Sequence, residues 1–107
     1  MNADGKNNPN DPSQEKIKSI LDLFNSNKLN DAKKEIDKQL IKYPKSSILF
    51  NILGAILSSQ NNLKEALSSY IQSIKINPNY AQAYNNLGVC MYKLGKFEES
   101  IQNYEKA

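Results

Sequence analysis

The sequence repeats itself with a period of 34 residues, and this period constrains the fold more than any other feature of the chain. Three segments align without a gap: residues 13–46, residues 47–80 and residues 81–107, the last of which stops before a full period. The residues that recur in register are Leu29, Leu63 and Phe97; Ala32, Ala66 and Ser100; Ile36, Tyr70 and Tyr104; Phe50 and Tyr84; Leu53 and Leu87; Gly54 and Gly88; and Pro44 and Pro78. So many matches of residue size in one frame indicate a tandem structural repeat.

Each segment has the pattern of two helices. In the second segment, apolar residues from Leu63 to Ile74 follow the i, i+3, i+4, i+7 spacing of one buried stripe. The stretch before it, residues 48–57, is apolar on nearly every side, which indicates a helix covered by neighbours all round. Strand patterns are absent from the sequence. The sequence therefore predicts an all-α fold of helix-turn-helix repeats.

The expected turns carry residues that tolerate unusual backbone conformations. Asn27, Asn61 and Gly95 stand between the paired helices, and these residue types accept the left-handed conformation that ends a helix. Pro44 and Pro78 are expected to stop the second helix of their repeats.

The ends of the helices carry possible caps. Asp11 is expected to cap the first helix with Pro12 at its first position. The stretch Lys45-Ser46-Ser47 and the residue Asn79 are expected to supply the caps of later helices. Residues 1–12 are polar and lack apolar periodicity, so we expect a disordered tail before a helical domain over residues 13–107.

The period and the recurring residues resemble the tetratricopeptide repeat (TPR) family. The resemblance implies a right-handed α-solenoid of about three repeats, the last truncated, with a concave and a convex face. The residues that carry it, and to which it assigns a structural role, are Phe50, Leu53, Gly54, Ala66, Tyr70, Pro78, Tyr84, Leu87, Gly88 and Phe97. In the first repeat Lys16, Ser19 and Ile20 replace the aromatic residue and the Leu-Gly pair, which indicates either an N-terminal capping repeat with a polar outer face or a degenerate helix.

The resemblance also implies a peptide-binding groove along the first helix of each repeat. The expected groove residues are Ile17, Leu21, Phe24, Asn51, Ala55, Ser58, Asn85, Asn86, Val89 and Tyr92. For each asparagine, solvated surface is the competing interpretation, because the chain is rich in asparagine throughout.

Two ligand classes of the family can be compared with these positions. Some members hold the terminal carboxylate of chaperones with basic residues and asparagine, and the corresponding positions here are Ile17, Leu21, Ile52, Gln82 and Asn86. Four of the five do not match, so binding of chaperone tails is not expected. Repeat domains of protein O-linked N-acetylglucosamine transferases hold a peptide backbone with an asparagine ladder, of which only Asn86 is matched, while Ile52 and Lys18 are not.

Composition argues against several other functions. The chain has no histidine and no arginine, and Cys90 is its single cysteine, expected on a buried helix face. We therefore expect no catalytic site, cofactor or metal. A net charge of +3 with interspersed signs does not favour nucleic acid, and no apolar run could cross a membrane. A cytoplasmic location is the default expectation.

Three functions follow. The favoured one is a non-catalytic scaffold that binds a peptide or partner helix in its groove. The alternatives are the substrate-recruiting N-terminal array of a larger glycosyltransferase or sulfotransferase, and an RNA-binding helical repeat. The incomplete third repeat also predicts a homodimer through apolar residues at its C-terminal end, chiefly Met91, Leu94, Ile101 and Tyr104.

Overall fold

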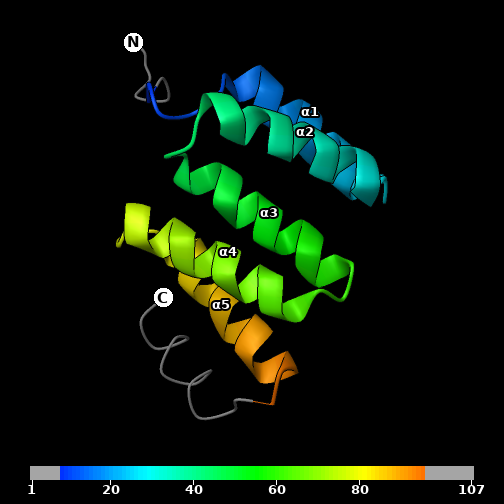
Figure 1. Ribbon diagram of the computed structural model, residues 1–107, viewed down its shortest axis with the longest axis vertical. Coiled ribbons are helices and arrows are strands. Elements are labelled where there is room, and N and C mark those ends of the chain that lie inside the picture. Colours follow the sequence, from blue (N-terminus) through cyan, green and yellow to red (C-terminus); the bar gives the residue numbers. More distant parts are fainter. Residues whose placement is uncertain (1–7, 96–107) are drawn as a thin grey trace.

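The computed structural model describes residues 8–95, and these residues form five α-helices and no strand (Figure 1). The helices are α1 (Gln14–Asn25), α2 (Leu29–Lys42), α3 (Ser47–Ser59), α4 (Leu63–Ile76) and α5 (Ala81–Lys93). The bounds of α2 and α4, like those of α3 and α5, recur with the sequence period. The all-α repeat fold is confirmed.

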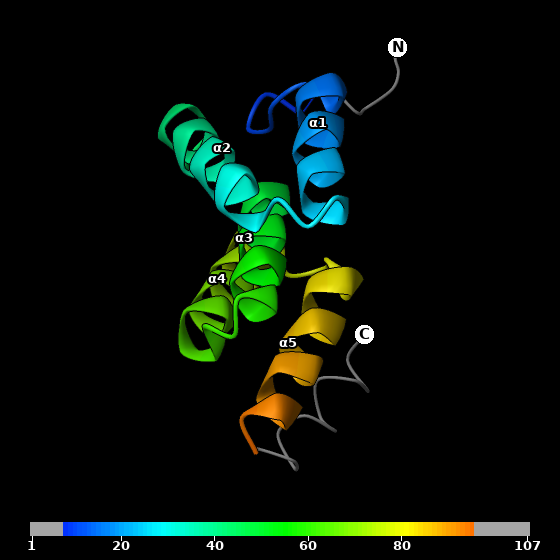
Figure 2. The ribbon, with the colours of Figure 1, turned by 90° about the vertical axis from the view of Figure 1, so that its right-hand side faces the viewer.

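The helices form two layers (Figure 2). Helices α1 and α5 lie on one side of α3, and α2 and α4 lie on the other side. Consecutive helices pack against each other along the whole array, with α3 and α4 in the most extensive contact. This arrangement makes α1, α3 and α5 the inner helices of a solenoid and makes α2 and α4 its outer helices.

The turns between paired helices have the predicted backbone conformation. Asn27 has a φ of 62°, Asn61 a φ of 65°, and Gly95 a φ of 83°. These are left-handed values, which asparagine and glycine adopt more readily than other residues. The predicted helix-ending role of the three residues is confirmed.

The helix caps agree with the sequence only in part. A cap of α3 was predicted from residues 45–47, and Ser46 supplies it, because its hydroxyl accepts a hydrogen bond from the Leu49 backbone N–H at 3.2 Å. The prediction that Asp11 caps α1 is wrong. Ser13 caps α1 by accepting a hydrogen bond from the Lys16 N–H, while the Asp11 carboxylate accepts a 2.5 Å bond from the Ser46 hydroxyl.

The cap predicted at Asn79 is also wrong. The residue before α5 is Tyr80, which makes no side-chain capping bond. The Asn79 backbone N–H instead donates to the Asn77 side-chain oxygen at 3.2 Å, in a local turn that ends before the helix begins.

The Asp11–Ser46 contact predicts unequal effects of two serine substitutions. Ser46 is fully buried and both caps α3 and donates to Asp11, whereas Ser13 is exposed and only caps α1. We expect Ser46→Ala to lower the free energy of unfolding by about 2–3 kcal/mol and Ser13→Ala by about 1 kcal/mol. Urea denaturation of both variants measures the difference. Equal losses would show that the Asp11 contact contributes nothing to stability.

The first two repeats fill the space between their paired helices with different residues. The pair α1 and α2 is the first hairpin, and the pair α3 and α4 is the second. Gly54 on α3 faces Tyr70 on α4 so closely that an added Cβ would lie 2.6 Å from Tyr70 Cδ1. At the corresponding positions of the first hairpin stand Ile20 and Ile36, which are both fully buried in one cluster. A small residue therefore faces a large one in the second repeat, and two residues of intermediate size replace them in the first.

The burial of the other residues predicted to build the repeats varies, and their structural role stays a prediction. Ala66 and Leu87 are buried, and Phe50, Leu53 and Tyr84 are half-buried. Gly88 is buried, Pro78 follows the end of α4, and Phe97 lies outside the described residues.

The first repeat replaces aromatic packing with a polar contact. Lys16, which stands where Phe50 stands in the second repeat, forms a 3.2 Å ion pair with Glu35 of α2. The Gln39 side chain donates to the same carboxylate at 3.0 Å, and this bond and the Lys16 contact lower the pKa of Glu35. Ser19 is exposed. These contacts favour the interpretation of the first repeat as a capping repeat, which stays a prediction.

Candidate functional site

A groove lies between the inner helices and holds a cavity of about 210 Å³. The cavity is lined by residues of α1, of α3 and of the start of α5. Helices α1 and α5 lie on the same side of α3 (Figure 2). The residues that line this cavity are Ile17, Leu21, Phe24, Ile48, Asn51, Ile52, Ala55, Tyr80, Gln82 and Asn86. Most of them are apolar, so we call this part the apolar section of the groove.

A second, larger hollow of about 620 Å³ adjoins the first, because Ile17, Ile48 and Tyr80 line both. It lies where the N-terminal ends of α1 and α3 meet the turn between α4 and α5. Its remaining lining residues are mostly polar: Asn8, Asn10, Asp11, Gln14, Lys45, Ser47, Ile76 and Asn77. We call this part the polar section of the groove. Together the two sections give an open path past three helices.

The structure brings together part of the predicted groove. Four of the eight principal candidates line the apolar section, namely Phe24, Asn51, Ala55 and Asn86, together with the predicted Ile17 and Leu21. Ser58, Asn85, Val89 and Tyr92 line neither section. Asn85 and Tyr92 are exposed elsewhere on α5, and Ser58 lies near the C-terminal end of α3. A role in binding stays a prediction for every one of these residues.

Asn51 sits in a chain of side-chain hydrogen bonds beneath the groove. Only 5 % of Asn51 is exposed. Its side-chain oxygen accepts a bond from Asn86 Nδ2 at 3.0 Å, and its own Nδ2 donates to the Tyr80 hydroxyl oxygen at 3.4 Å. The Asn51 amide is thus engaged within the protein by Asn86 and Tyr80.

Sequence reasoning missed Tyr80, which lies where the two sections of the groove meet. The 34-residue period places Tyr80 in register with Ser46, directly before the first helix of a repeat. The signal that could have found it is a large amphipathic side chain at the start of an inner helix. Burial raises the pKa of the Tyr80 phenol, the Asn51 hydrogen bond opposes this, and the Asp11 charge adds to it. Tyr80 therefore stays a neutral hydroxyl near physiological pH.

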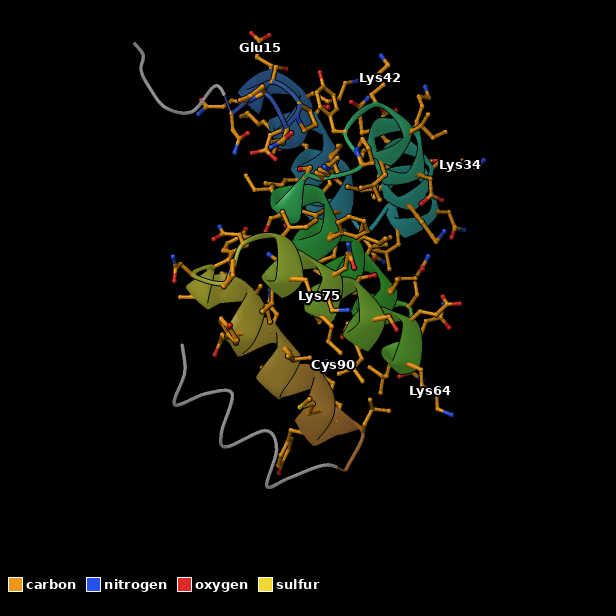
Figure 3. All side chains as sticks on the ribbon, turned by 60° about the vertical axis from the view of Figure 1, so that its left-hand side comes forward. Glu15, Lys34, Lys42, Lys64, Lys75 and Cys90 are labelled. Carbon is orange, nitrogen blue, oxygen red and sulfur yellow. The ribbon has the colours of Figure 1, made fainter. Side chains whose placement is uncertain are left out.

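Charge is nearly absent from the groove. No charged residue lines the apolar section, and Asp11 and Lys45 are the two charged residues that line the polar section. The lysines gather elsewhere: Lys34 and Lys42 project from α2, and Lys64 and Lys75 project from α4 (Figure 3). The groove is therefore suited to an uncharged ligand more than to an anion.

Within residues 8–95 the side chains offer no other obvious chemistry. This part of the chain holds no group of three or more potential metal ligands, and none of its helices has the length and apolarity that membrane crossing requires.

Cys90 is 1 % exposed, as predicted, and its thiol donates to the Leu63 carbonyl at 3.3 Å. Burial raises the pKa of this thiol, which makes it a poor nucleophile.

The predicted self-association surface is described only in part. Met91 and Leu94 are half-buried against a cluster formed by α3, α4 and α5. Ile101 and Tyr104 lie outside the described residues. A homodimer through this end of the array stays a prediction.

Residues 54–95 match the family model described as TPR repeat. The chain is 39 % identical over 64 residues to the BBSome complex member BBS4 homolog of Drosophila melanogaster, covering 60 % of this chain and 13 % of the relative. It is 36 % identical over 80 residues to Hsp70-Hsp90 organizing protein 1 of Glycine max, covering 75 % of this chain and 14 % of the relative.

An enzyme also appears among the relatives. The chain is 34 % identical over 61 residues to the probable UDP-N-acetylglucosamine–peptide N-acetylglucosaminyltransferase SPINDLY of Oryza sativa subsp. japonica, covering 57 % of this chain and 7 % of the relative. In these three relatives the match spans less than a sixth of the relative's length.

Two solved structures share the fold. The crystal structure of MamA superposes with a TM-score of 0.79 at 25 % identity, over 85 % of this chain and 53 % of that chain. The second TPR domain of Spaghetti (RPAP3), bound to the HSP90 peptide SRMEEVD, superposes with a TM-score of 0.80 at 18 % identity, over 86 % of this chain and 85 % of that chain.

Proposed function

Because the chain belongs to the tetratricopeptide-repeat family, we propose that it is a non-catalytic interaction module that binds a segment of another protein in the groove between α1, α3 and α5. One observation carries this proposal. The apolar section of the groove is also lined by a row of polar groups: Asn51 on α3, Tyr80 directly before α5, and Asn86 on α5. Binding sites for protein segments combine an apolar surface with a few placed hydrogen-bonding groups in this way.

The comparisons support a peptide as the ligand. The RPAP3 domain of the same fold is bound to a peptide, and a relative is named as an organizer of two chaperones. The short groove of this chain suggests modest affinity, with a Kd of about 1 μM, or about −8 kcal/mol.

The ligand differs from the acidic peptide of the RPAP3 complex. The positions that resemble the family's carboxylate-binding site fall in the apolar section, where they carry Ile17, Leu21, Ile52, Gln82 and Asn86. None of these side chains bears a positive charge. An acidic chain terminus would lose its hydration there without gaining an ionic partner, which is unfavourable.

A second candidate is a substrate-recruiting array of a larger glycosyltransferase. The match to the SPINDLY relative, which is named as an N-acetylglucosaminyltransferase, favours this candidate. The groove would then hold the peptide that the enzyme modifies. Both candidates share the same binding site, so one experiment tests the site for both.

The experiment is a selection of ligands from a displayed library of random linear peptides, with immobilised 107-residue chain as the bait. We expect enrichment of a related set of peptides that compete with one another for one site with Kd values of about 1–10 μM. If repeated rounds enrich no peptide above an empty support, the proposal is wrong.

A further inference from the structure

The positive charge of the chain is concentrated in residues 28–45, which comprise α2 and the residues that flank it. This segment contains six lysines and three acidic residues, so its net charge of +3 equals the net charge of the whole chain. The rest of the chain contains eight lysines and eight acidic residues, which balance. The charge asymmetry of this protein therefore belongs to one outer helix.

The structure separates charges that alternate along this part of the sequence. The Asp37 carboxylate forms a 2.9 Å ion pair with Lys33, and the Glu35 carboxylate forms a 3.2 Å ion pair with Lys16 of α1. The third acidic residue, Asp31, lies in the first turn of α2, where the helix dipole favours a negative charge. Two of the three acidic charges are thus balanced by Lys16 and Lys33, which leaves the other lysines of the segment as net positive charge.

Those lysines share the outward side of α2 with an exposed isoleucine. Positions 34, 38 and 41 have the i, i+4, i+7 spacing of one helix face, position 42 is adjacent, and position 45 follows the end of the helix. Ile41 is 83 % exposed. Within residues 8–95, Lys34, Lys42 and Lys45 form no ion pair. We call this set the basic stripe: Lys34, Lys38, Ile41, Lys42 and Lys45.

The basic stripe faces away from the groove. Helix α2 belongs to the outer layer, and the inner helices α1 and α5 lie on the opposite side of α3 (Figure 2). Lys34 and Lys42 project outward from α2 (Figure 3). A partner that binds the stripe therefore leaves the groove between α1, α3 and α5 open to a peptide.

We propose that the basic stripe docks the chain onto the surface of a lipid bilayer that contains anionic lipids. The lysines interact with the charged headgroups, and the Ile41 side chain enters the interface between them. The chain then binds a membrane surface on its outer side and a peptide on its inner side, which holds the partner protein at the membrane. This inference goes beyond the proposed function and does not depend on it.

The composition of the stripe favours lipid over nucleic acid. All its cations are lysines, which are point charges on flexible stems, and the chain has no arginine, whose planar guanidinium suits phosphate and base edges best. Ile41 finds no apolar partner on a phosphate and sugar backbone. At a bilayer interface, an aliphatic side chain among lysines adds apolar burial to the electrostatic attraction.

The shape of the stripe favours a lipid surface over an acidic polypeptide. Its residues come from the outward side of a single helix and from the residues that follow it, so they form a ridge. Sites that hold one defined ligand are usually concave, with walls that restrict its position. A bilayer needs no walls, because its mobile headgroups rearrange around the lysines.

The first test is sedimentation of the whole 107-residue chain with lipid vesicles. We expect binding to vesicles of phosphatidylcholine with about one third phosphatidylserine, none to phosphatidylcholine alone, and a loss of binding with added salt. The double variant Lys34→Gln with Lys42→Gln should bind the anionic vesicles about 25-fold more weakly, because each lysine near such a surface contributes about fivefold.

A second double variant controls for net charge. Lys18→Gln with Lys93→Gln removes the same two charges from α1 and α5, which lie on the opposite side of α3 from α2. Its vesicle binding should stay within about twofold of the wild-type value, since its lysines lie far from the docked surface. Equal losses in the two double variants would show that net charge alone drives binding and would overturn the basic stripe.

The second test reports which side of the chain meets the lipid. The chain has no tryptophan, so Ile41→Trp supplies a single tryptophan fluorophore within the stripe. Its emission should move to shorter wavelength when anionic vesicles are added, because the indole leaves water. Tyr92→Trp, at a position on α5 that is 56 % exposed, should show no such change. A change at position 92 with none at position 41 would contradict the proposed orientation.

The remaining outcomes separate the partner classes. A chain that ignores anionic vesicles but binds polyglutamate or single-stranded RNA through Lys34 and Lys42 would overturn the assignment to lipid. The Lys34→Gln, Lys42→Gln variant should bind the peptides from the selection described above as the wild-type chain does. Loss of vesicle binding therefore leaves the proposed function standing, and a selection that enriches no peptide leaves the membrane contact standing.

Discussion

Replacement of Gly54 by isoleucine is expected to lower the free energy of unfolding by about 3 kcal/mol or more. The reason is steric: a Cβ at this position would lie 2.6 Å from Tyr70 Cδ1, and isoleucine adds three further carbons. Tyr70 is 3 % exposed within a packed cluster, so its ring has little room to move. Thermal and urea denaturation measure the loss.

The first repeat suggests how the loss can be reversed. Ile20 and Ile36 stand there at the positions of Gly54 and Tyr70, and both are fully buried. The double variant Gly54→Ile with Tyr70→Ile should therefore be more stable than Gly54→Ile alone, with a coupling of about 2 kcal/mol. Ala55→Ile is the neighbouring control, because Ala55 lines an open groove, and its effect should stay within about 1 kcal/mol.

If Gly54→Ile and Ala55→Ile have equal stability, the close contact between Gly54 and Tyr70 does not limit the residue at position 54. If the free energy of unfolding of the double variant falls by the full sum of the losses in the two single variants, the pair Ile20–Ile36 does not pack in the way that the pair Gly54–Tyr70 does.

Introduction of a lysine at Leu21 is expected to weaken binding of the selected peptides about 30-fold or more. Leu21 is 37 % exposed in the apolar section, so a lysine there removes an apolar contact and obliges the ligand to cover a charge. Ile41 on α2 is 83 % exposed and lines neither section of the groove. Ile41→Lys makes the same chemical change on the outer layer and should leave the Kd within about twofold of the wild-type value.

The two lysine variants separate the groove from general effects of charge. Both raise the net charge equally and both replace an accessible aliphatic residue, so differences in solubility or long-range electrostatics are small. Circular dichroism should show the same helix content for both. Equal affinities of Leu21→Lys and Ile41→Lys for the peptides would place the binding site outside the apolar section.

The features that the sequence predicted well are those that depend on neighbours in the chain. Asn27, Asn61 and Gly95 ended helices as expected, because tolerance of a left-handed backbone is a property of the residue itself. Helix pairs followed from the 3.6-residue apolar period, and the repeat then fixed which helices are neighbours. Ile20 was recognised as a departure from the pattern, but its compensation by Ile36 required the packed structure.

The features that the sequence missed depend on contacts between distant residues. Asp11 has the right type and place for a helix cap, but it bonds to Ser46, which is 35 positions away. Asn51 was expected to face a ligand, but Asn86, also 35 positions away, engages its amide within the protein. Tyr80 was not among the predicted groove residues, because its position relative to α1 and α3 cannot be deduced from local pattern.

The central claim is that a ligand occupies the groove between α1, α3 and α5, and nuclear magnetic resonance tests it most directly. The amide resonances of the isotope-labelled chain are followed while a selected peptide is added. The account predicts that the largest shifts fall on Leu21, Phe24, Ala55, Tyr80 and Asn86, with little change along α2 and α4. Largest shifts on the outer helices, around Ile41 or Ser68, with an unchanged groove would contradict it.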